Sequence, residues 1–114
     1  KSVATIEKDL GKYVPVGVFQ ITIECEKALD IYEDYPHLYD KKELDIILDG
    51  IQVTAMTYVM VAKYGIAPPS RKYFNVISEG YKNCGLNSDF LLEAEEYSIK
   101  ADTGKGYEST RWNQ

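Results

Sequence analysis

The side chains that most often carry catalysis are few in this sequence, and they do not suggest a common site. The 114 residues include a single histidine, His37. A Ser–His–Asp or Cys–His arrangement could use only this histidine, and nothing near it in the sequence suggests a nucleophile. Asp30, Asp34 and His37 could share a helix face, but Pro36 interrupts that helix. We therefore expect neither catalysis nor metal binding at His37, which we interpret as a connector residue facing water.

The two cysteines, Cys25 and Cys84, have no local pair of the kind that a zinc knuckle needs. Each lies on an apolar helical stripe, so we interpret both as reduced, buried, small hydrophobic residues. One bridge between them is the alternative. No glycine-rich phosphate loop follows a predicted strand. These absences favour a noncatalytic protein with no metal and no cofactor.

The overall charge argues against a general nucleic-acid binder. The formal net charge is −5 at pH 7, and an acidic protein repels phosphates at long range. We therefore expect no general binding of duplex DNA, although one local basic pocket remains compatible with the charge. No apolar run approaches the length of about 18 residues that a membrane span needs. No signal peptide is visible, so we expect a cytoplasmic protein.

Hydrophobic periodicity predicts helices along most of the chain. They cover residues 2–10, 19–35, 40–64, 70–83, and a last stretch from Ser88 to Gly104. The apolar stripe expected to face inward on the second helix consists of Val18, Ile21, Cys25, Ala28 and Tyr32. A buried strand over residues 59–61 is a minor alternative to the third helix, but length favours the helix. The predicted fold is an all-α, mostly up-and-down four-helix bundle, a single domain over residues 1–114 with a short extra N-terminal helix.

The predicted helix over residues 40–64 has a second apolar face. Its members are Val53, Met56, Val59 and Met60. A helix that is apolar nearly all round is either central or in contact with a second chain. This face predicts a homodimer, because monomers seldom keep so large an apolar patch exposed. The competing explanation is that residues 2–10 cover the same face.

Three features of the second half carry a family resemblance. A long predicted helix ends in the turn of residues 62–69, which contains a lysine, a glycine and two prolines. A short helix over residues 70–83 follows, and an aromatic residue and an Arg-aromatic pair come late, at Tyr107 and Arg111-Trp112. This layout resembles the HEPN superfamily. The ribonuclease motif of that superfamily, an arginine followed closely by a histidine, is not intact.

The resemblance implies a noncatalytic helical module that binds a nucleotide or substrate and serves as the accessory domain of a nucleotidyltransferase partner. Guanidinium and ammonium groups could bind phosphates, a helix start could add backbone N–H donors, and aromatic rings could stack on a base. The candidate nucleotide- or phosphate-binding residues are Ser70, Arg71, Lys72, Tyr73, Tyr107, Arg111 and Trp112. Two alternatives stay open: a structural homodimeric bundle, and a degenerate HEPN ribonuclease or toxin component. Solvated surface positions and ordinary helix capping are the simpler interpretation of these residues.

Overall fold

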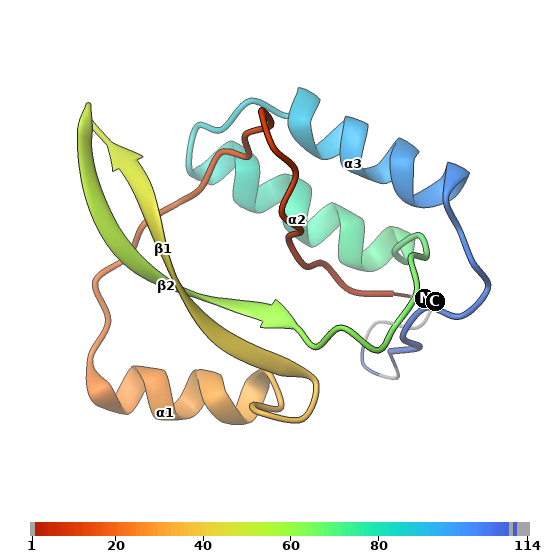
Figure 1. Ribbon diagram of the computed structural model, residues 1–114, viewed down its shortest axis with the longest axis horizontal. Helices are drawn as coiled ribbons and strands as arrows, with labels where there is room; N and C mark the ends of the chain where they lie inside the picture. The colour runs from red at the N-terminus through yellow and green to blue at the C-terminus, as the bar shows by residue number, and fades with distance from the viewer. Residues whose placement is uncertain (1, 110, 112–114) are drawn as a thin grey trace. The chain divides into compact units, whose positions relative to one another are not determined.

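The computed structural model describes residues 2–109 and 111, and these form three helices and a two-stranded antiparallel sheet (Figure 1). In chain order the elements are α1 (Ile23–Tyr32), β1 (Tyr39–Leu48), β2 (Ile51–Met60), α2 (Arg71–Asn83) and α3 (Asp89–Lys100). The fold is therefore of the α/β class. The predicted all-α four-helix bundle is wrong.

The largest difference from the prediction is at residues 40–64, which form a β-hairpin in place of a helix. β1 and β2 pair in antiparallel register over their whole length. The turn between them is Asp49-Gly50, whose φ angles are 51° and 79°. Two positive φ values in a two-residue turn match the twist of the flanking strands, and Asp-Gly is a preferred sequence there. The strands are also rich in isoleucine, valine and threonine, whose branched side chains suit a pleated surface.

The two C-terminal helices form where periodicity predicts them. Ser70 is the N-cap of α2, and its Oγ accepts a hydrogen bond from the backbone N–H of Tyr73 at 3.1 Å. Gly85, with a φ of 67°, follows the end of α2, and Ser88 precedes α3. The capping Ser70 and the left-handed Gly85 are local signals, so they could be identified without knowledge of the tertiary fold.

The predicted N-terminal helix over residues 2–10 is absent. Ser2 instead forms a parallel bridge with Pro69, and its backbone N–H donates to the carbonyl of Pro68 at 3.2 Å. The predicted helix over residues 19–35 is present but shorter, since α1 begins after the N-cap Thr22 and its last residue is Tyr32. The Thr22 hydroxyl accepts from the Cys25 N–H at 3.1 Å, which fixes where α1 starts.

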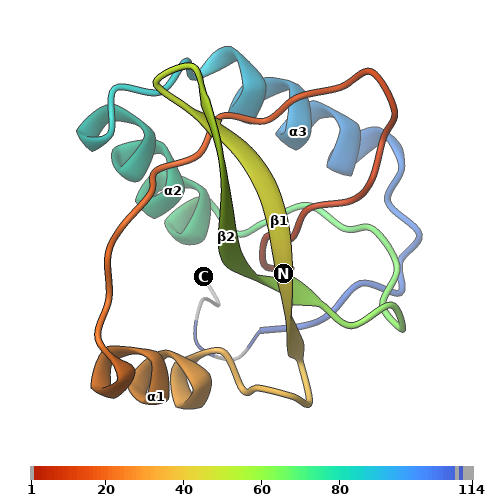
Figure 2. The ribbon, with the colours of Figure 1, turned by 60° about the vertical axis from the view of Figure 1, so that its left-hand side comes forward.

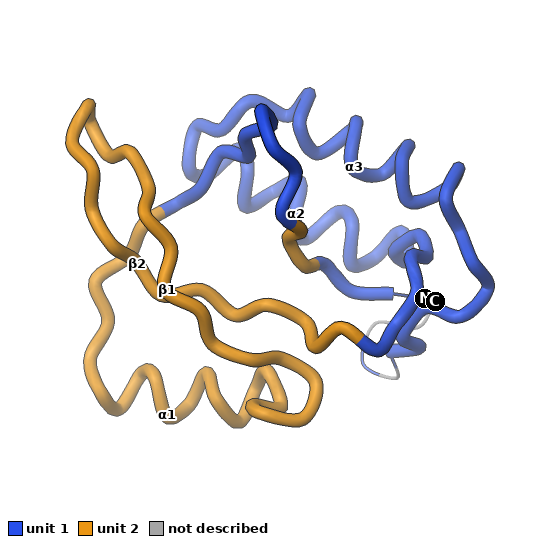
Figure 3. Tube along the Cα trace, in the orientation of Figure 1, with its two compact units in different colours: residues 1–4, 8–17, 63–114 blue, residues 5–7, 18–62 orange. Residues whose placement is uncertain are grey.

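The chain divides into two compact units (Figure 3). Unit 1 comprises residues 1–4, 8–17 and 63–114 and contains α2 and α3. Unit 2 comprises residues 5–7 and 18–62 and contains α1 and the hairpin. Within unit 2, α1 lies beside the end of the hairpin that is opposite its turn (Figure 2). The prediction of a single domain stays a prediction.

Little apolar surface is fully buried in the residues described. The buried apolar side chains are Tyr39, at the start of β1, and Phe74, in α2. Each unit therefore contributes one of them. In the described part of the chain, none of the helices has the length and apolar character needed to cross a membrane.

Candidate functional site

The helix α1 turns two acidic side chains inward and leaves most of its apolar side chains exposed. Its half-buried residues are Glu26, Leu29 and Asp30, followed one turn later by the C-cap residue Glu33. Leu29, Asp30 and Glu33 follow Glu26 by three, four and seven residues, and this spacing places all four on one face of the helix. Ile31, by contrast, is 83% exposed. The predicted inward stripe is therefore wrong: Ile21, Cys25, Ala28 and Tyr32 are exposed.

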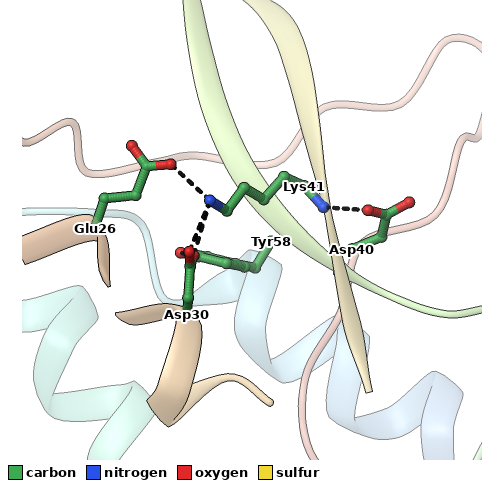
Figure 4. A network of polar contacts seen from close by, with 5 residues as sticks. All are labelled: Glu26, Asp30, Asp40, Lys41 and Tyr58. Atoms are coloured by element: carbon green, nitrogen blue, oxygen red, sulfur yellow. Dashed lines mark hydrogen bonds and ion pairs between the residues drawn. The ribbon is translucent and has the colours of Figure 1, made fainter. Parts of the chain in front are cut away.

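Lys41 explains why this acidic face turns inward (Figure 4). Lys41 extends from β1, and its Nζ lies 2.6 Å from a carboxylate oxygen of Glu26 and 2.9 Å from one of Asp30. Its side chain is 21% exposed, so most of the side chain is covered while water still reaches the ion pairs. A partly buried charge is costly unless an opposite charge pairs with it. The two carboxylates pair with Lys41, and the ion pairs connect α1 to β1.

Two tyrosine rings complete this cluster. The hydroxyl of Tyr58, on β2 directly opposite Lys41, donates a short hydrogen bond to Asp30. The ring of Tyr35 packs edge-on against the Tyr58 ring, with centroids 6.5 Å apart, and the Lys41 ammonium lies 4.5 Å from the Tyr35 centroid. A cation over an aromatic face is attracted to the ring electrons. The cluster of Glu26, Asp30, Tyr35, Lys41 and Tyr58 therefore combines ionic, hydrogen-bonding and aromatic contacts.

The protonation of this cluster follows from its contacts. The hydrogen bond from Tyr58, and then that from Lys41, lowers the pKa of Asp30 below its ordinary value of 3.8. Hydrogen bonds to Glu26 and Asp30 raise the pKa of Lys41. Desolvation, and then the hydrogen bond to Asp30, raises the pKa of Tyr58 to about 12. At neutral pH Asp30 is therefore ionised, Lys41 is charged and Tyr58 is a neutral donor.

The third acidic side chain of the inner face lies at the end of α1. Glu33 is half-buried and is the C-cap residue, and its backbone N–H donates to the carbonyl of Leu29 at 2.8 Å. Asp34 follows with a φ of 51°, a left-handed conformation that is uncommon outside glycine but tolerated by aspartate. Non-glycine residues in this conformation occur often at functional sites. Glu33 thus lies at the end of α1, directly before a residue in the left-handed conformation.

His37 follows this junction and faces solvent. Its Nδ1 lies 3.6 Å from Asp34, and its side chain is 81% exposed. The described residues contain no group of three or more histidine, cysteine or acidic side chains arranged to hold a metal ion.

The candidate phosphate-binding residues fall in unit 1 and have structural contacts there. Ser70 caps α2 and is 1% exposed. Arg71 donates to Glu95 of α3 at 2.8 Å and lies over the Phe74 ring. Lys72 is exposed, and the Tyr73 hydroxyl accepts from the backbone N–H of Ala4 at 3.0 Å.

The later members of that set are spread along the C-terminal segment. The Tyr107 ring packs edge-on against Tyr64, with centroids 5.2 Å apart. Arg111 is exposed, and Trp112 lies outside the described residues. Phosphate binding by this set stays a prediction.

Two further expectations need correction. Cys25 and Cys84 are free, but both are exposed, so their burial was wrongly predicted. The predicted dimer face over Val53–Met60 does not exist as one surface, because successive residues of a strand point to opposite sides. Val53 and Val59 lie on one face of β2, and the two methionines, Met56 and Met60, lie on the other. A homodimer stays a prediction, as does a nucleotidyltransferase partner.

The sequence analysis placed the apolar stripe of this helix inward and so missed the acidic site. One signal was present: Glu26, Asp30 and Glu33 repeat at helical spacing, as regularly as the apolar stripe. Nothing in the sequence pairs them with Lys41, because that contact requires the hairpin.

No curated protein and no solved structure gives a significant match to the chain. The sequence model of the AIG2-like family matches residues 13–93. That match spans α1, the hairpin, α2 and the start of α3. It overturns the HEPN resemblance, and with it the interpretation as a noncatalytic nucleotide-binding module. The chain belongs to the AIG2-like family.

Proposed function

We propose that this chain acts in a γ-glutamylcyclotransferase-type reaction, in which a γ-glutamyl amide is converted to 5-oxoproline and a free amine. The observation that carries the proposal is membership of the AIG2-like family, which is related to γ-glutamylcyclotransferase-type enzymes. The inward acidic face of α1 supports it, because it provides carboxylates at a half-buried position within the matched residues.

The reaction needs a proton carrier and no other reactant. The α-amino nitrogen of the γ-glutamyl group attacks the γ-carbonyl carbon, and a five-membered lactam forms. The amide C–N bond then breaks, and its electron pair leaves with the departing nitrogen. A proton must move from the attacking nitrogen to the leaving one. A carboxylate placed between them can accept the first proton and return it as a general acid.

Among the three acidic residues of the inner face, Glu33 is our candidate for this carrier because of its place at the end of α1, beside the left-handed Asp34. Glu26 and Asp30 both contact the Lys41 ammonium. The pKa of Asp30 is also lowered, which makes its carboxylate a weaker base. These two residues are better suited to hold α1 against the hairpin. Glu33 lies one turn further along, at the end of the helix and beside the left-handed Asp34.

The test is release of 5-oxoproline from a panel of γ-glutamyl amino acids and γ-glutamyl peptides. Glu33→Gln keeps the size and hydrogen-bonding reach of the side chain but removes its proton-transfer capacity. We expect it to lower kcat by about 10²–10⁴-fold. Glu43→Gln, at an exposed position of β1, is the matched control and should keep wild-type activity.

The outcomes separate the reaction from the residue. If wild-type protein releases 5-oxoproline from none of these substrates, the proposed function is wrong. If the wild type is active and Glu33→Gln keeps full kcat, the reaction stands but a different group carries the proton.

A further inference from the structure

The strand β2 combines two properties that seldom occur together on an exposed strand. Its sequence from Ile51 to Met60 contains no charged residue, whereas β1 contains Asp40, Lys41, Lys42, Glu43 and Asp45. None of the ten residues of β2 is fully buried. Within residues 2–109 and 111, β1 is its only strand neighbour. Folded proteins usually protect an open strand edge with charge, and in this hairpin only β1 has that protection.

Three hydrogen bonds establish which backbone groups of β2 point away from β1. The N–H of Val61 donates to Leu38 at 2.9 Å, so odd-numbered positions face β1. The N–H of Met60 donates instead to the Thr5 hydroxyl at 2.8 Å, so it points away from β1. On β1, the N–H of Lys41 donates to the Asp40 carboxylate and so points away from Tyr58, the residue opposite it on β2. In an antiparallel pair, outward and inward groups alternate. The outer edge of β2 therefore consists of the backbone groups of Gln52, Thr54, Met56 and Tyr58, and it is capped at Met60.

We propose that this outer edge pairs with the same edge of a second copy of the chain, in antiparallel orientation. Two hairpins would then join into one four-stranded sheet with β1 on each outside. Antiparallel pairing of identical strands about a two-fold axis is self-complementary, because each N–H meets the C=O of its counterpart. An uncharged strand also places no like charges opposite one another.

The capped end fixes the register of this pairing. Because the Met60 N–H is already engaged, the edge available runs from Gln52 to Tyr58, and its centre is Ala55. Thr54 of one copy then lies opposite Met56 of the other, and Ala55 lies opposite itself. Ala55 belongs to the face of the hairpin on which Leu44, Ile46 and Val53 also lie. That apolar face becomes continuous across the two copies, which extends the surface available for burial.

The first test uses two lysine substitutions that break the same hydrogen bond. The Thr54 hydroxyl donates to Asp45 across the hairpin at 3.0 Å, so Thr54→Lys and Asp45→Lys both remove this bond. Only Thr54→Lys places a charge on the proposed interface. By light scattering at high micromolar concentration, we expect wild type and Asp45→Lys at twice the 13.0 kDa chain mass. We expect Thr54→Lys at the chain mass itself.

Any of three results overturns the proposal. If the wild type is monomeric, the outer edge of β2 does not pair with a second copy of the chain. A dimeric Thr54→Lys shows that the dimer uses another surface. Dissociation of both variants shows that the dimer needs the Asp45–Thr54 hydrogen bond and not the uncharged edge.

A crosslinking experiment tests the register. In a background with Cys25→Ser and Cys84→Ser, Ala55→Cys places two thiols opposite each other, with Cα atoms about 4.5–5.5 Å apart as in other antiparallel pairs. This separation is within the range that a disulfide spans. Mild oxidation should give a covalent dimer of Ala55→Cys and none of Thr57→Cys, which would face Val53 of the second copy. Crosslinking at Thr57 in place of Ala55 contradicts the proposed pairing.

Discussion

The helices α1 and α2 show two ways in which a helix can present a face to its neighbours. In α2 the side chain that becomes buried is apolar, Phe74, and charged residues such as Arg71 stay at the surface. In α1 the half-buried side chains include Glu26 and Asp30, while Ile31 faces water. The difference comes from what lies opposite: α1 faces the ammonium of Lys41. A helix can therefore break the usual burial rule where an opposite charge compensates, as Lys41 does for Glu26 and Asp30.

The largest expected difference between the two helices is in the cost of removing an isoleucine or phenylalanine side chain. Phe74→Ala should lower the free energy of unfolding by about 3–5 kcal/mol, because it deletes a buried ring and leaves a cavity. Ile31→Ala, on the exposed side of α1, should change it by no more than about 0.5 kcal/mol. Urea denaturation followed by circular dichroism measures both. A comparable loss in the two variants would show that Ile31 is covered in solution and that α1 is not inverted.

The second difference concerns the hydroxyl of Tyr58. Tyr58→Phe keeps the ring and removes the donor to Asp30, leaving a half-buried carboxylate with one bond fewer. Hydrogen bonds to charged groups contribute more to stability than those between neutral groups, and we expect Tyr58→Phe to lower the free energy of unfolding measurably. Tyr97→Phe, at an exposed position of α3, is the control and should have little effect. If both substitutions lowered the free energy of unfolding equally, the hydrogen bond from Tyr58 to Asp30 would not be a specific source of stability.

How far the sequence could predict this fold depends on whether the signals were local. Ser70 and Gly85 act within one turn of helix, and α2 and α3 were predicted close to their observed bounds. The hairpin was missed although Asp49-Gly50 is a strong turn signal between two β-branched runs. Apolar residues on both faces of β2 also matched helical spacing, and the length of the run favoured a helix over a short strand at residues 59–61.

The inverted face of α1 could not be predicted by the same means. Periodicity places Cys25 and Tyr32 on one stripe and Glu26 and Asp30 on another, but it does not say which stripe faces inward. Hydrophobicity alone selects the apolar stripe. The choice is reversed by Lys41, a contact between residues distant in sequence that exists only once β1 and β2 have formed.

A smaller contrast separates the two serines that precede α2 and α3. Ser70 accepts a hydrogen bond from the helix backbone, whereas Ser88 has helical backbone angles and makes no capping bond through its side chain. Ser70→Ala should cost about 1 kcal/mol, as is typical for loss of an N-cap, and Ser88→Ala clearly less. Thermal unfolding of both variants measures the difference. A larger loss for Ser88→Ala would mean that α3 begins elsewhere in solution.

The smallest expected effect is the pH dependence that Asp30 contributes. The folded protein holds the pKa of Asp30 below 3.8, first through Tyr58 and then through Lys41, so the unfolded chain binds this proton more tightly. The stabilisation is therefore complete above pH 3.8 and is lost as the pH falls through the lower folded value. Water reaches the pair, since Asp30 and Lys41 are 27% and 21% exposed, and screening keeps the contribution modest.

Asp30→Asn tests this pH dependence directly. The variant should unfold at a lower temperature than wild type at neutral pH, because Lys41 loses one of its two counter-charges. The difference between the two proteins should shrink as the pH falls from 3.8 through the lower folded pKa of Asp30, because wild-type Asp30 then becomes neutral as well. Glu24→Gln, at an exposed position of the same helix, should track wild type across the whole range. Added salt should narrow the neutral-pH difference, since the ion pair is partly screened. If the difference in unfolding temperature stayed the same at acid pH, the shape of the Asp30 side chain, and not its charge, would explain its contribution.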